Sequence, residues 1–255
     1  MPTGFNIVIP ARFASSRLPG KPLLDIAGKP MIQHVHERAV ESGAETIVIA
    51  TDDEKIQSAC QQFGADCCMT DPDHMSGSDR IAEVLEKYQW PNDTIIVNLQ
   101  GDEPLMRPEL ITQVGEDMAA HQTAVMTTLC TPIHTAAELL DPHVVKVVTN
   151  RDGYAMYFSR AAIPWDRDAF AIDTEELPEN SQHYRHIGLY AYKASFIREY
   201  SQLAPCYEEQ TESLEQLRVL WHGYQIHVSF TEIPPGHGVD TPQDLERVTG
   251  LLASC

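Results

Sequence analysis

The stretch Phe5–Pro10, FNIVIP, is an apolar run typical of a strand that is buried on both faces of a parallel sheet. Two further runs of the same kind follow it, TIVIAT at Thr46–Thr51 and TIIVNL at Thr94–Leu99. Helical segments are expected between them, because Pro30 and Gly43 bracket one amphipathic stretch as helix start and stop signals. This alternation of strand and helix predicts an α/β fold with a doubly wound sheet.

The remaining elements are expected by the same signals. Helices are predicted from Met31 to about Ser42, from a cap at Asp52 or Asp53 to about Phe63, from Ser78 to Tyr88, from Pro108 onward, at Gln210–Trp221 and after Pro242. Strands are predicted from Ala124 onward, at Val144–Thr149, at His186–Tyr192 with one exposed face, and at Ile226–Ile233. The polar stretch Asp166–Tyr184 indicates a loop, and this middle region suggests a small second lobe or a dimerisation region.

Length, charge and cysteine content bound the function. The chain has 255 residues and a formal net charge of −19, which argues against nucleic acid or a membrane surface as a general partner, since both are negative. The six cysteines form no CxxC pair, so we expect reduced thiols and a cytoplasmic protein. The first residues do not resemble a signal peptide, and no apolar run is long enough to cross a bilayer.

A basic loop, Pro10–Pro22, follows the first strand directly. It carries Arg12, Arg17 and Lys21 in a chain that is otherwise acidic, and positive charge on a turn is what a triphosphate requires. A solvated surface loop is the alternative interpretation. The loop is neither a Walker A motif, because Ser15 and Pro22 replace required residues, nor a GxGxxG dinucleotide motif. It therefore predicts a phosphate site of another class.

Acidic residues lie after the third strand and before the last helix. Asp102, in Gln100–Pro104, stands at the carboxyl end of a strand, where a carboxylate can bind Mg²⁺ together with phosphate oxygens. An ordinary acidic turn is the alternative. Asp240 precedes Thr241 and Pro242, which read as a simple helix start, so the residues alone do not require a metal there.

Polar residues of the second half have ordinary explanations. Helical spacing would place Glu212, Glu215 and Gln216 on a solvated face, away from the leucines of the same helix. His186 and Tyr190 share one face of a predicted strand, where either could be simple packing. His34 and His36 are expected at the surface of their helix. With Glu37 they form no HExxH motif, so no zinc is predicted.

Several long motifs, in order, resemble the 3-deoxy-manno-octulosonate (Kdo) cytidylyltransferases, also called CMP-Kdo synthetases. The resemblance runs from about Phe5 to Val248, nearly the whole chain. The motifs are VIPARFASSRLPGKPLLDIAGKPMI (8–32), IVNLQGDEP (96–104), RHIGLYAY (185–192), ESLEQLRVLWHG (212–223) and GVDTPQDLERV (238–248). The resemblance implies a Rossmann-like mixed sheet of the nucleotidyltransferase type with a smaller dimerisation lobe. We expect a core at about 1–130 and 205–255 and a sugar-binding and dimerisation lobe at about 131–204, within one unit.

The resemblance also implies an activity and a set of site residues. It implies CTP and Kdo as substrates, CMP-Kdo and pyrophosphate as products, lipopolysaccharide biosynthesis as the purpose, Mg²⁺ as the cofactor and a homodimer as the assembly. Residues implied for the nucleotide are Arg12, Arg17, Lys21, Ser76, Arg80 and Asp102; for the sugar, Gln100, Arg160, His186, Tyr190, Glu215 and Gln216; and for the metal, Asp102 and Asp240.

The mechanism expected on this basis is in-line attack of the sugar's anomeric C2 hydroxyl on the α-phosphorus of CTP. We expect Lys21 and Arg12 to offset charge on the leaving pyrophosphate, and Asp102 to act through the metal. Alternatives are the same reaction on the 8-amino analogue of Kdo, a cytidylyl- or uridylyltransferase acting on sialic acid or a sugar phosphate, and a non-catalytic CTP- or sugar-binding regulator. A dehydrogenase is disfavoured by the missing glycine motif.

Overall fold

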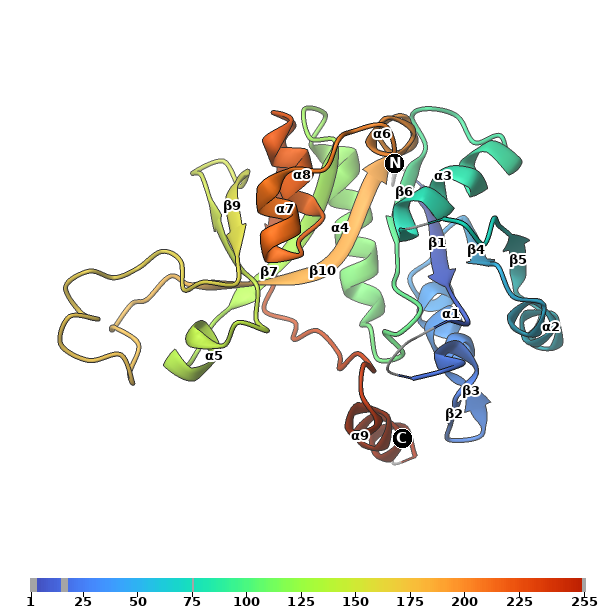
Figure 1. Cartoon of the computed structure of the whole chain (residues 1–255), viewed down its shortest axis with the longest axis horizontal. Helices are drawn as coiled ribbons and strands as arrows, with labels where there is room; N and C mark the ends of the chain where they lie inside the picture. Colours follow the sequence, from blue (N-terminus) through green and yellow to red (C-terminus); the bar gives the residue numbers. More distant parts are fainter. Residues whose placement is uncertain (1–3, 15–17, 75, 254–255) are drawn as a thin grey trace.

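The computed structural model describes residues 4–14, 18–74 and 76–253 (Figure 1). Within these ranges the central sheet has nine strands: β1 (Asn6–Ala11), β4 (Thr46–Thr51), β5 (Asp66–Met69), β6 (Ile95–Asn98), β7 (Met126–Pro132), β8 (Lys146–Thr149), β9 (Ala155–Ser159), β10 (Tyr184–Lys193) and β11 (Ile226–Phe230). The main order is β11-β7-β10-β6-β1-β4-β5. β10 runs antiparallel to both its neighbours β6 and β7, and the other pairs along this path are parallel.

The strand order reverses at β1, which confirms the predicted doubly wound sheet. β1 pairs with β4 on one side and with β6 on the other. Chain segments that leave these two strands at their carboxyl ends diverge around a crevice, which is where ligands bind in open α/β sheets. The basic loop follows β1 and the Gln100–Pro104 segment follows β6, so the fold brings both to this crevice.

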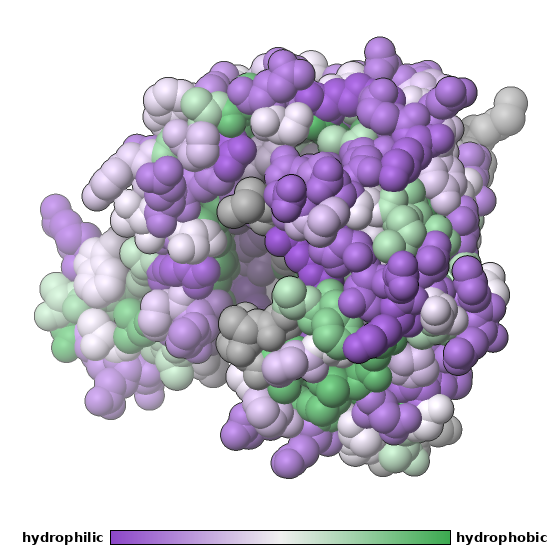
Figure 2. All heavy atoms as spheres, turned by 45° about the vertical axis from the view of Figure 1, so that its right-hand side comes forward, coloured by the Kyte–Doolittle hydropathy of each residue, from purple (hydrophilic) through white to green (hydrophobic). Residues whose placement is uncertain are grey.

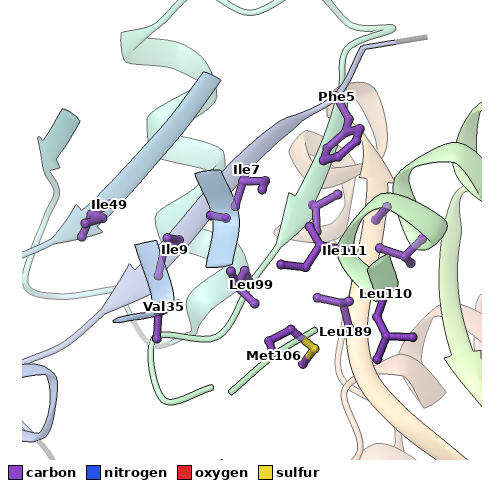
Figure 3. Packing of buried hydrophobic residues seen from close by; sticks show 14 of the residues in the cluster. Phe5, Ile7, Ile9, Val35, Ile49, Leu99, Met106, Leu110, Ile111 and Leu189 are labelled. Carbon is purple, nitrogen blue, oxygen red and sulfur yellow. The ribbon is translucent and has the colours of Figure 1, made fainter. Parts of the chain in front are cut away.

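Helices cover both faces of the sheet, and the apolar side chains of each central strand point alternately to one face and the other. On one face Ile7 and Ile9 pack with α1 (Met31–Glu41), α2 (Glu54–Phe63) and α4 (Pro108–Ala120), as Figure 3 shows in close-up. On the other face Val8 packs with α3 (Gly77–Lys87), α6 (Ala194–Tyr200) and α8 (Gln216–Trp221). Successive side chains of a strand point to opposite faces. The FNIVIP run is apolar throughout because its side chains pack in the hydrophobic cores on both faces of the sheet.

Capping residues set the helix ends largely as the sequence predicts. Asp53 accepts hydrogen bonds from Lys55 N and Ile56 N at the start of α2, which settles the choice between Asp52 and Asp53. Gly64 ends that helix at φ 77°, a left-handed conformation that favours glycine. Thr241 caps α9 (Pro242–Leu252) in a capping box with Asp244, as expected.

Two smaller elements complete the first half, and one histidine prediction there is wrong. The basic loop ends in a 3₁₀ turn at Lys21–Leu23, which leads to a short hairpin of β2 (Asp25–Ile26) and β3 (Lys29–Pro30). His34 lies in α1 but is buried, because its Nε2 hydrogen-bonds to Ile26 O at 2.7 Å across the hairpin. The contact spans only eight residues, but the helical pattern around His34 does not indicate it.

The expected exposed face of the strand at His186–Tyr192 is also wrong. β10 is a central strand with helices on both faces of the sheet, so Arg185 and Gly188 are its exposed positions. It also pairs with β8, which forms a hairpin with β9, and this hairpin and α5 (Ala136–Leu140) lie on the left side of Figure 1. Within 131–204 the chain thus extends the sheet by a hairpin beyond its main strand order.

The single helix predicted at Gln210–Trp221 is in fact two short helices. α7 (Tyr207–Glu212) ends at Ser213, which has φ 53°, and α8 starts at Gln216. Leu214 N bonds back to Glu209 O at 3.2 Å and completes the turn. The left-handed residue changes the direction of the chain, so that Gln216 is buried, whereas Glu215 remains exposed, as the sequence predicts.

Among the described helices, none combines the length and the apolar character that crossing a bilayer requires.

Candidate functional site

A cleft of about 320 Å³ opens at the crevice between β1 and β6. Its lining combines the basic loop, the segment after β6 and the approach to α9: Pro10, Ala11, Arg12, Ala14, Lys21, Pro22, Met31, Gln100, Gly101, Asp102 and Asp240. Figure 2 shows the molecule hollowed near its centre, with hydrophilic residues around the opening. Polar side chains from three distant segments therefore converge on one concave surface.

The basic loop presents its cations through its turn geometry. Gly20 has φ 67° and donates its N–H to Phe13 O at 3.1 Å, which folds the loop back so that Lys21 enters the cleft. Arg12 also lines the cleft, and its Nη2 atom is buried without a hydrogen-bond partner among the described residues. A buried, unpaired guanidinium nitrogen is unfavourable unless an anion meets it. Arg17, the third predicted cation, lies outside the described residues.

Lys21 links the two predicted metal ligands. Its ammonium group lies 2.6 Å from Asp102 Oδ2 and 3.0 Å from Asp240 Oδ1, and only about a tenth of its side chain is exposed. Val239 N donates to Asp102 O at 2.9 Å and fixes the approach to α9 against the segment after β6. Residues 102 and 240 are thus neighbours in space, which the helix-start signal at Thr241 could not reveal.

A third carboxyl group, which the sequence analysis did not single out, lies beside this pair. Burial, together with the charges of Asp102 and Asp240, raises the pKa of Glu103 to about 8, against smaller opposing effects of Lys21 and Arg185. Three carboxyl groups around one lysine make a region that attracts cations. Gly238 accommodates Glu103, since a Cβ at that position would lie 2.8 Å from Glu103 Oε1.

Gly101 lets the two strand ends approach each other. A Cβ on this residue would lie 2.8 Å from the backbone oxygen of Pro10, which cannot move without displacing β1. We expect Gly101→Ala to lower the free energy of unfolding by roughly 1–3 kcal/mol through overpacking and to lower kcat/KM as the cleft distorts. Urea unfolding and steady-state kinetics would check this. Gly188→Ala is the matched control, because its Cβ would meet nothing within 4 Å; equal effects of the two substitutions would contradict the argument.

A second cavity, of about 220 Å³, adjoins the first through the shared residue Gln100. It lies between the carboxyl end of β6, the strand β10 and the turn before α8, and its lining is Ser78, Asn98, Gln100, Met126, Tyr190, Tyr192, Tyr200, Ser213, Leu214, Glu215 and Gln216. Four of the six residues predicted for the sugar, Gln100, Tyr190, Glu215 and Gln216, meet here. Hydroxyl, amide and carboxyl groups in one enclosed space suit a polyhydroxylated ligand.

The second cavity contains a buried donor without a partner and two protonated phenols. Gln216 Nε2 is buried and has no hydrogen-bond partner among the described residues. Burial raises the pKa of Glu215, and the nearby Glu209 adds to the effect. Burial also raises the pKa values of Tyr190 and Tyr200, which keeps both phenols protonated, and the Tyr200 hydroxyl donates to Glu215 O at 3.3 Å. The unpaired donor of Gln216 favours a bound polar ligand over an empty cavity.

Arg160 and His186 line neither cavity in this structure. Arg160 donates from Nε to Glu212 O at 2.6 Å, and its backbone N donates to Glu212 Oε2 at 2.8 Å. Glu212 therefore fastens the end of β9 to α7, and the predicted solvated face is wrong for this residue too. His186 is buried behind Tyr190, with ring centroids 5.5 Å apart, and its Nε2 lies 2.9 Å from Thr128 Oγ1.

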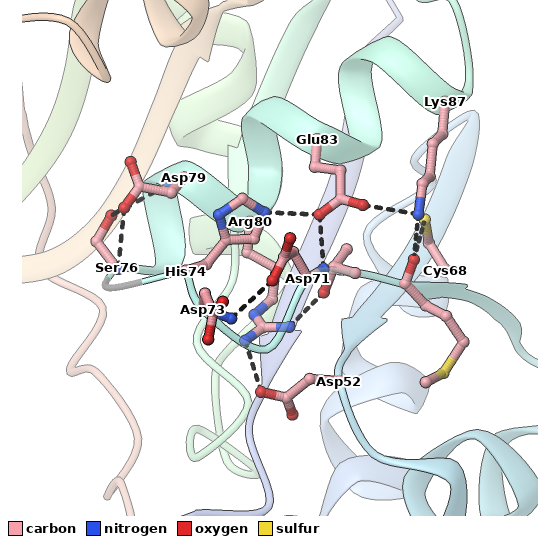
Figure 4. A network of polar contacts seen from close by, with 12 residues as sticks. Asp52, Cys68, Asp71, Asp73, His74, Ser76, Asp79, Arg80, Glu83 and Lys87 are labelled. Atoms are coloured by element: carbon pink, nitrogen blue, oxygen red, sulfur yellow. Dashed lines mark hydrogen bonds and ion pairs between the residues drawn. The ribbon is translucent and has the colours of Figure 1, made fainter.

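Ser76 and Arg80, predicted for the nucleotide, also line neither cavity. Figure 4 shows Ser76 paired with Asp79 at the start of α3, where the two form a capping box. Arg80 is fully buried and donates to Thr70 Oγ1 and, at 2.9 Å, to Asp52 Oδ2. Its Nε has no partner among the described residues. Arg80 therefore ties α3 to the end of β4.

His186 makes the stability of the fold depend on pH. Burial lowers its pKa to about 3, so the native state holds it neutral while the unfolded chain takes up a proton below pH 6.5. Its contribution is fully present above pH 6.5 and is lost as the pH falls toward 3, at up to about 1.4 kcal/mol per pH unit.

We expect the free energy of unfolding of His186→Asn to depend less steeply on pH, because one proton fewer is taken up on unfolding. Urea unfolding between pH 4 and 7 would measure the slope. The exposed His143→Asn is the control. A slope that is unchanged in His186→Asn would contradict the assignment.

Comparison with known proteins shows the family of the chain. A family model described as "Cytidylyltransferase" matches residues 6–226. A 3-deoxy-manno-octulosonate cytidylyltransferase of Aeromonas hydrophila subsp. hydrophila is 55% identical over 254 residues, which is 98% of this chain and 99% of that protein. The chain belongs to the 3-deoxy-manno-octulosonate cytidylyltransferase family. A member from Pseudomonas fluorescens is also 55% identical, over 252 residues and 99% of each chain.

Solved structures agree with this family and with the predicted nucleotidyltransferase-type fold. A structure of CMP:2-keto-3-deoxy-manno-octonic acid synthetase complexed with CTP superposes with a TM-score of 0.89 at 45% identity, and 99% of each chain is covered. A cytidylyltransferase from Leptospira borgpetersenii gives a TM-score of 0.62 at 15% identity, over 100% of this chain and 88% of the other. This second likeness concerns the fold alone.

Proposed function

We propose that this protein transfers CMP from CTP to the anomeric C2 hydroxyl of 3-deoxy-manno-octulosonate and releases pyrophosphate, a step that serves lipopolysaccharide biosynthesis. The observation that carries the proposal is the pair of adjoining cavities that share Gln100. The first is lined by Arg12 and Lys21 and suits a triphosphate. The second is enclosed and polar and suits a sugar acid. Together with family membership, this arrangement accounts for two substrates that must meet at one phosphorus atom.

Phosphoryl transfer depends mainly on position and charge, and the residues of the first cavity can supply both. Arg12 has an unpaired Nη2 for a phosphate oxygen. The ammonium group of Lys21 is held within the cleft, where it can meet a phosphate group once a cation takes its place between the carboxylates. We assign both residues to the triphosphate, and Arg17 with them on the basis of the sequence motif. Ser76 and Arg80 would join them if the segment before α3 rearranges on nucleotide binding.

Asp102 and Asp240 fit a divalent cation, which we propose to be Mg²⁺. The fit rests on the donor set, because two carboxylates already converge on one positive group, the ammonium of Lys21. Hard carboxylate oxygens together with phosphate oxygens are the usual Mg²⁺ ligands. When bound, the ion would neutralise phosphate charge and favour deprotonation of the attacking hydroxyl. Lys21 would then be released from the carboxylates toward the phosphates.

The second cavity would hold the sugar. Gln100 stands between the two cavities and would orient the C2 hydroxyl, while Tyr190, Glu215 and Gln216 offer donors and acceptors to the remaining oxygens. We place Arg160 and His186 in supporting positions, the first fastened to Glu212 and the second behind Tyr190. Asn98, Tyr192 and Tyr200 are further lining residues to which the sequence analysis had assigned no role.

The experiment that tests the activity measures pyrophosphate release with each nucleoside triphosphate and each acceptor. We expect CTP with Kdo to give the highest kcat/KM. The 8-amino analogue of Kdo and sialic acid are the competing acceptors, and UTP is the competing nucleotide. Release that is faster with sialic acid or with UTP would overturn the substrate assignment. Binding of CTP without turnover of any acceptor would instead identify a regulator.

We further propose that this is a cytoplasmic homodimer whose contact lies in the 131–204 lobe. Exposed apolar side chains support this, since Met156 is 66% exposed, Trp165 53% and Ile172 90%. Large exposed apolar residues concentrated in one region are typical of an interface. The free thiols of five described cysteines are consistent with a reducing compartment. Analytical ultracentrifugation would test the assembly, and a monomer at micromolar concentration would exclude it.

A further inference from the structure

Two histidines and an aspartate cluster far from the two cavities. Asp117 and His121 lie one turn apart near the end of α4, and His227 lies in the neighbouring strand β11. The Gln100–Pro104 segment precedes the opposite end of this helix. Because α4 has 13 residues, its two ends are about 20 Å apart. The cluster therefore belongs to a different region from the site that binds the substrates.

The three side chains converge on the carboxylate. His227 Nδ1 lies 2.7 Å from Asp117 Oδ2, and His121 Nδ1 lies 3.0 Å from Asp117 Oδ1. One potential ligand atom from each residue lies within 4.8 Å of the others. Two imidazole nitrogens and one carboxylate oxygen are a common ligand set for Zn²⁺ and related transition-metal ions, whereas Mg²⁺ prefers oxygen alone.

The carboxylate of Asp117 needs a positive partner. Its side chain is only 7% exposed, and a buried carboxylate is costly unless a cation is close. Within residues 4–14, 18–74 and 76–253, the ion-pair partners found for it are the two imidazoles, with no lysine or arginine. Neutral imidazoles donate hydrogen bonds to the carboxylate but do not cancel its charge. A divalent cation held by all three groups would do so.

Surrounding residues hold the cluster in place. The two imidazole rings are stacked, with centroids 3.5 Å apart and planes within 13°. Tyr154 stands edge-on to His227, and its hydroxyl lies 2.6 Å from Thr123 Oγ1. At Gly153, in the turn between β8 and β9, a Cβ would lie 2.6 Å from His227 Nε2. Thus the hairpin turn is pressed against one ring, and three elements meet at the cluster.

We propose that Asp117, His121 and His227 bind one divalent transition-metal ion of the Zn²⁺ class, which clamps the end of α4 to β11. Three protein ligands leave a fourth position for water. Ligand atoms around a tetrahedral ion are about 3.3 Å apart, given metal–ligand distances near 2.1 Å. The present Nδ1–carboxylate distances need widen only slightly, and the rings would tilt out of their parallel arrangement. His121, a third exposed, offers the entry path.

The sequence analysis predicted no zinc because it considered local motifs. Asp117 and His121 have helical i, i+4 spacing, but His227 is more than a hundred residues away and is brought in by the parallel pairing of β11 with β7. The lack of HExxH and CxxC motifs in the sequence therefore does not argue against metal binding by this cluster.

The test is a metal titration of the full chain after chelator treatment and removal of any affinity tag. Excess Mg²⁺ is present so that the carboxylates of the substrate cleft do not compete for the probe. We expect the protein to bind one equivalent of Zn²⁺ and to have a higher Tm with Zn²⁺ than without it. When Co²⁺ replaces Zn²⁺, we expect the visible absorption bands of tetrahedral, protein-bound Co²⁺.

The decisive variant is His121→Gln, because this side chain is the most exposed of the three and its loss should not prevent folding. We expect its affinity for Zn²⁺ to fall more than about 100-fold, since even groups that only support a ligand contribute 10–100-fold. His227→Gln should act in the same way, and the exposed His143→Gln is the matched control. kcat/KM for CTP should stay within twofold in His121→Gln, which separates this proposal from the assignment of the activity.

Two results would overturn the proposal. One is equal binding of Zn²⁺ by the unaltered protein and by His121→Gln, which would locate the metal elsewhere. The other is that the protein binds neither Zn²⁺ nor Co²⁺, and that its free energy of unfolding rises as the pH falls and the cluster takes up a proton. This rise would occur in the unaltered protein and not in His121→Gln. In that case an imidazolium, not a metal ion, would be the partner of Asp117.

Discussion

Lys21→Ala is expected to lower kcat/KM for CTP by a factor of roughly 10² to 10³, or about 2.7–4 kcal/mol of transition-state stabilisation, as for the loss of one preorganised oxyanion donor. Lys21 is placed to meet the phosphates of CTP from within the cleft, and its removal also leaves Asp102 and Asp240 without the cation that now separates their charges. Steady-state kinetics with CTP and Kdo would measure the loss.

The control for this prediction is Lys29→Ala. Lys29 belongs to the same N-terminal region but pairs with Glu37 at 2.8 Å, outside the cleft. An exposed ion pair of this kind contributes little, so activity should be nearly unchanged. Lys21→Arg would retain the charge but not the compact ammonium group, and we expect only partial recovery. A change below threefold in Lys21→Ala would show that Lys21 does not act on the reacting phosphates.

Asp102→Asn is expected to lower kcat by about 100-fold or more at ordinary Mg²⁺ concentration, and to raise the Mg²⁺ concentration required for half-maximal activity. The amide keeps the shape of the side chain but removes the charge that would hold a divalent ion beside the triphosphate. Titration of activity with Mg²⁺ would separate weaker metal binding, which high Mg²⁺ rescues, from a loss of chemistry, which it does not.

Asp240→Asn supplies the companion measurement. If Asp102 and Asp240 hold the same ion, the double variant should lose little more than the more damaged single variant, because residues that act as a unit are not additive. Asp168→Asn is the control, since that side chain is 86% exposed and pairs with its neighbour Arg167. Near-normal turnover of Asp102→Asn in saturating Mg²⁺ would contradict a metal role for this residue.

Much of the fold could be predicted from the sequence because it depends on local signals. The runs at β1, β4 and β6 are apolar on both faces, and Asp53, Gly64 and Thr241 mark helix ends through their own backbone contacts. The turn at Ser213 could not be predicted in this way. Serine is no stronger a break signal than its neighbours, and its left-handed conformation is imposed by the packing of Leu214 and Leu217 in the core.

The residues of the candidate site also fall into those that have a local signal in the sequence and those that do not. The cations of the basic loop stand out locally in an acidic chain, and so does Asp102 at a strand end. Asp240 and Gln216 were indicated only by resemblance to a family, because their surroundings are created by contacts between distant segments. Asn98, Glu103 and Tyr200 were assigned no role from the sequence. Asn98 and Glu103 lie in the motif at 96–104, but only their contacts with distant segments show what they do, and no element was predicted around Tyr200.

The position of β10 has a consequence for synthesis of the protein. β6 has its second neighbour only when β10 has emerged, because β10 pairs with β6 and β7 at the middle of the sheet. The whole stretch from Leu99 to His183 must be translated first, which takes several seconds at about 5–20 residues per second. During that time the hydrogen-bonding edge of β6 faces the surroundings of the ribosome, where unpaired strand edges recruit other chains. We therefore expect the nascent chain to need more protection from association than the completed fold, in which the edge of β6 is paired.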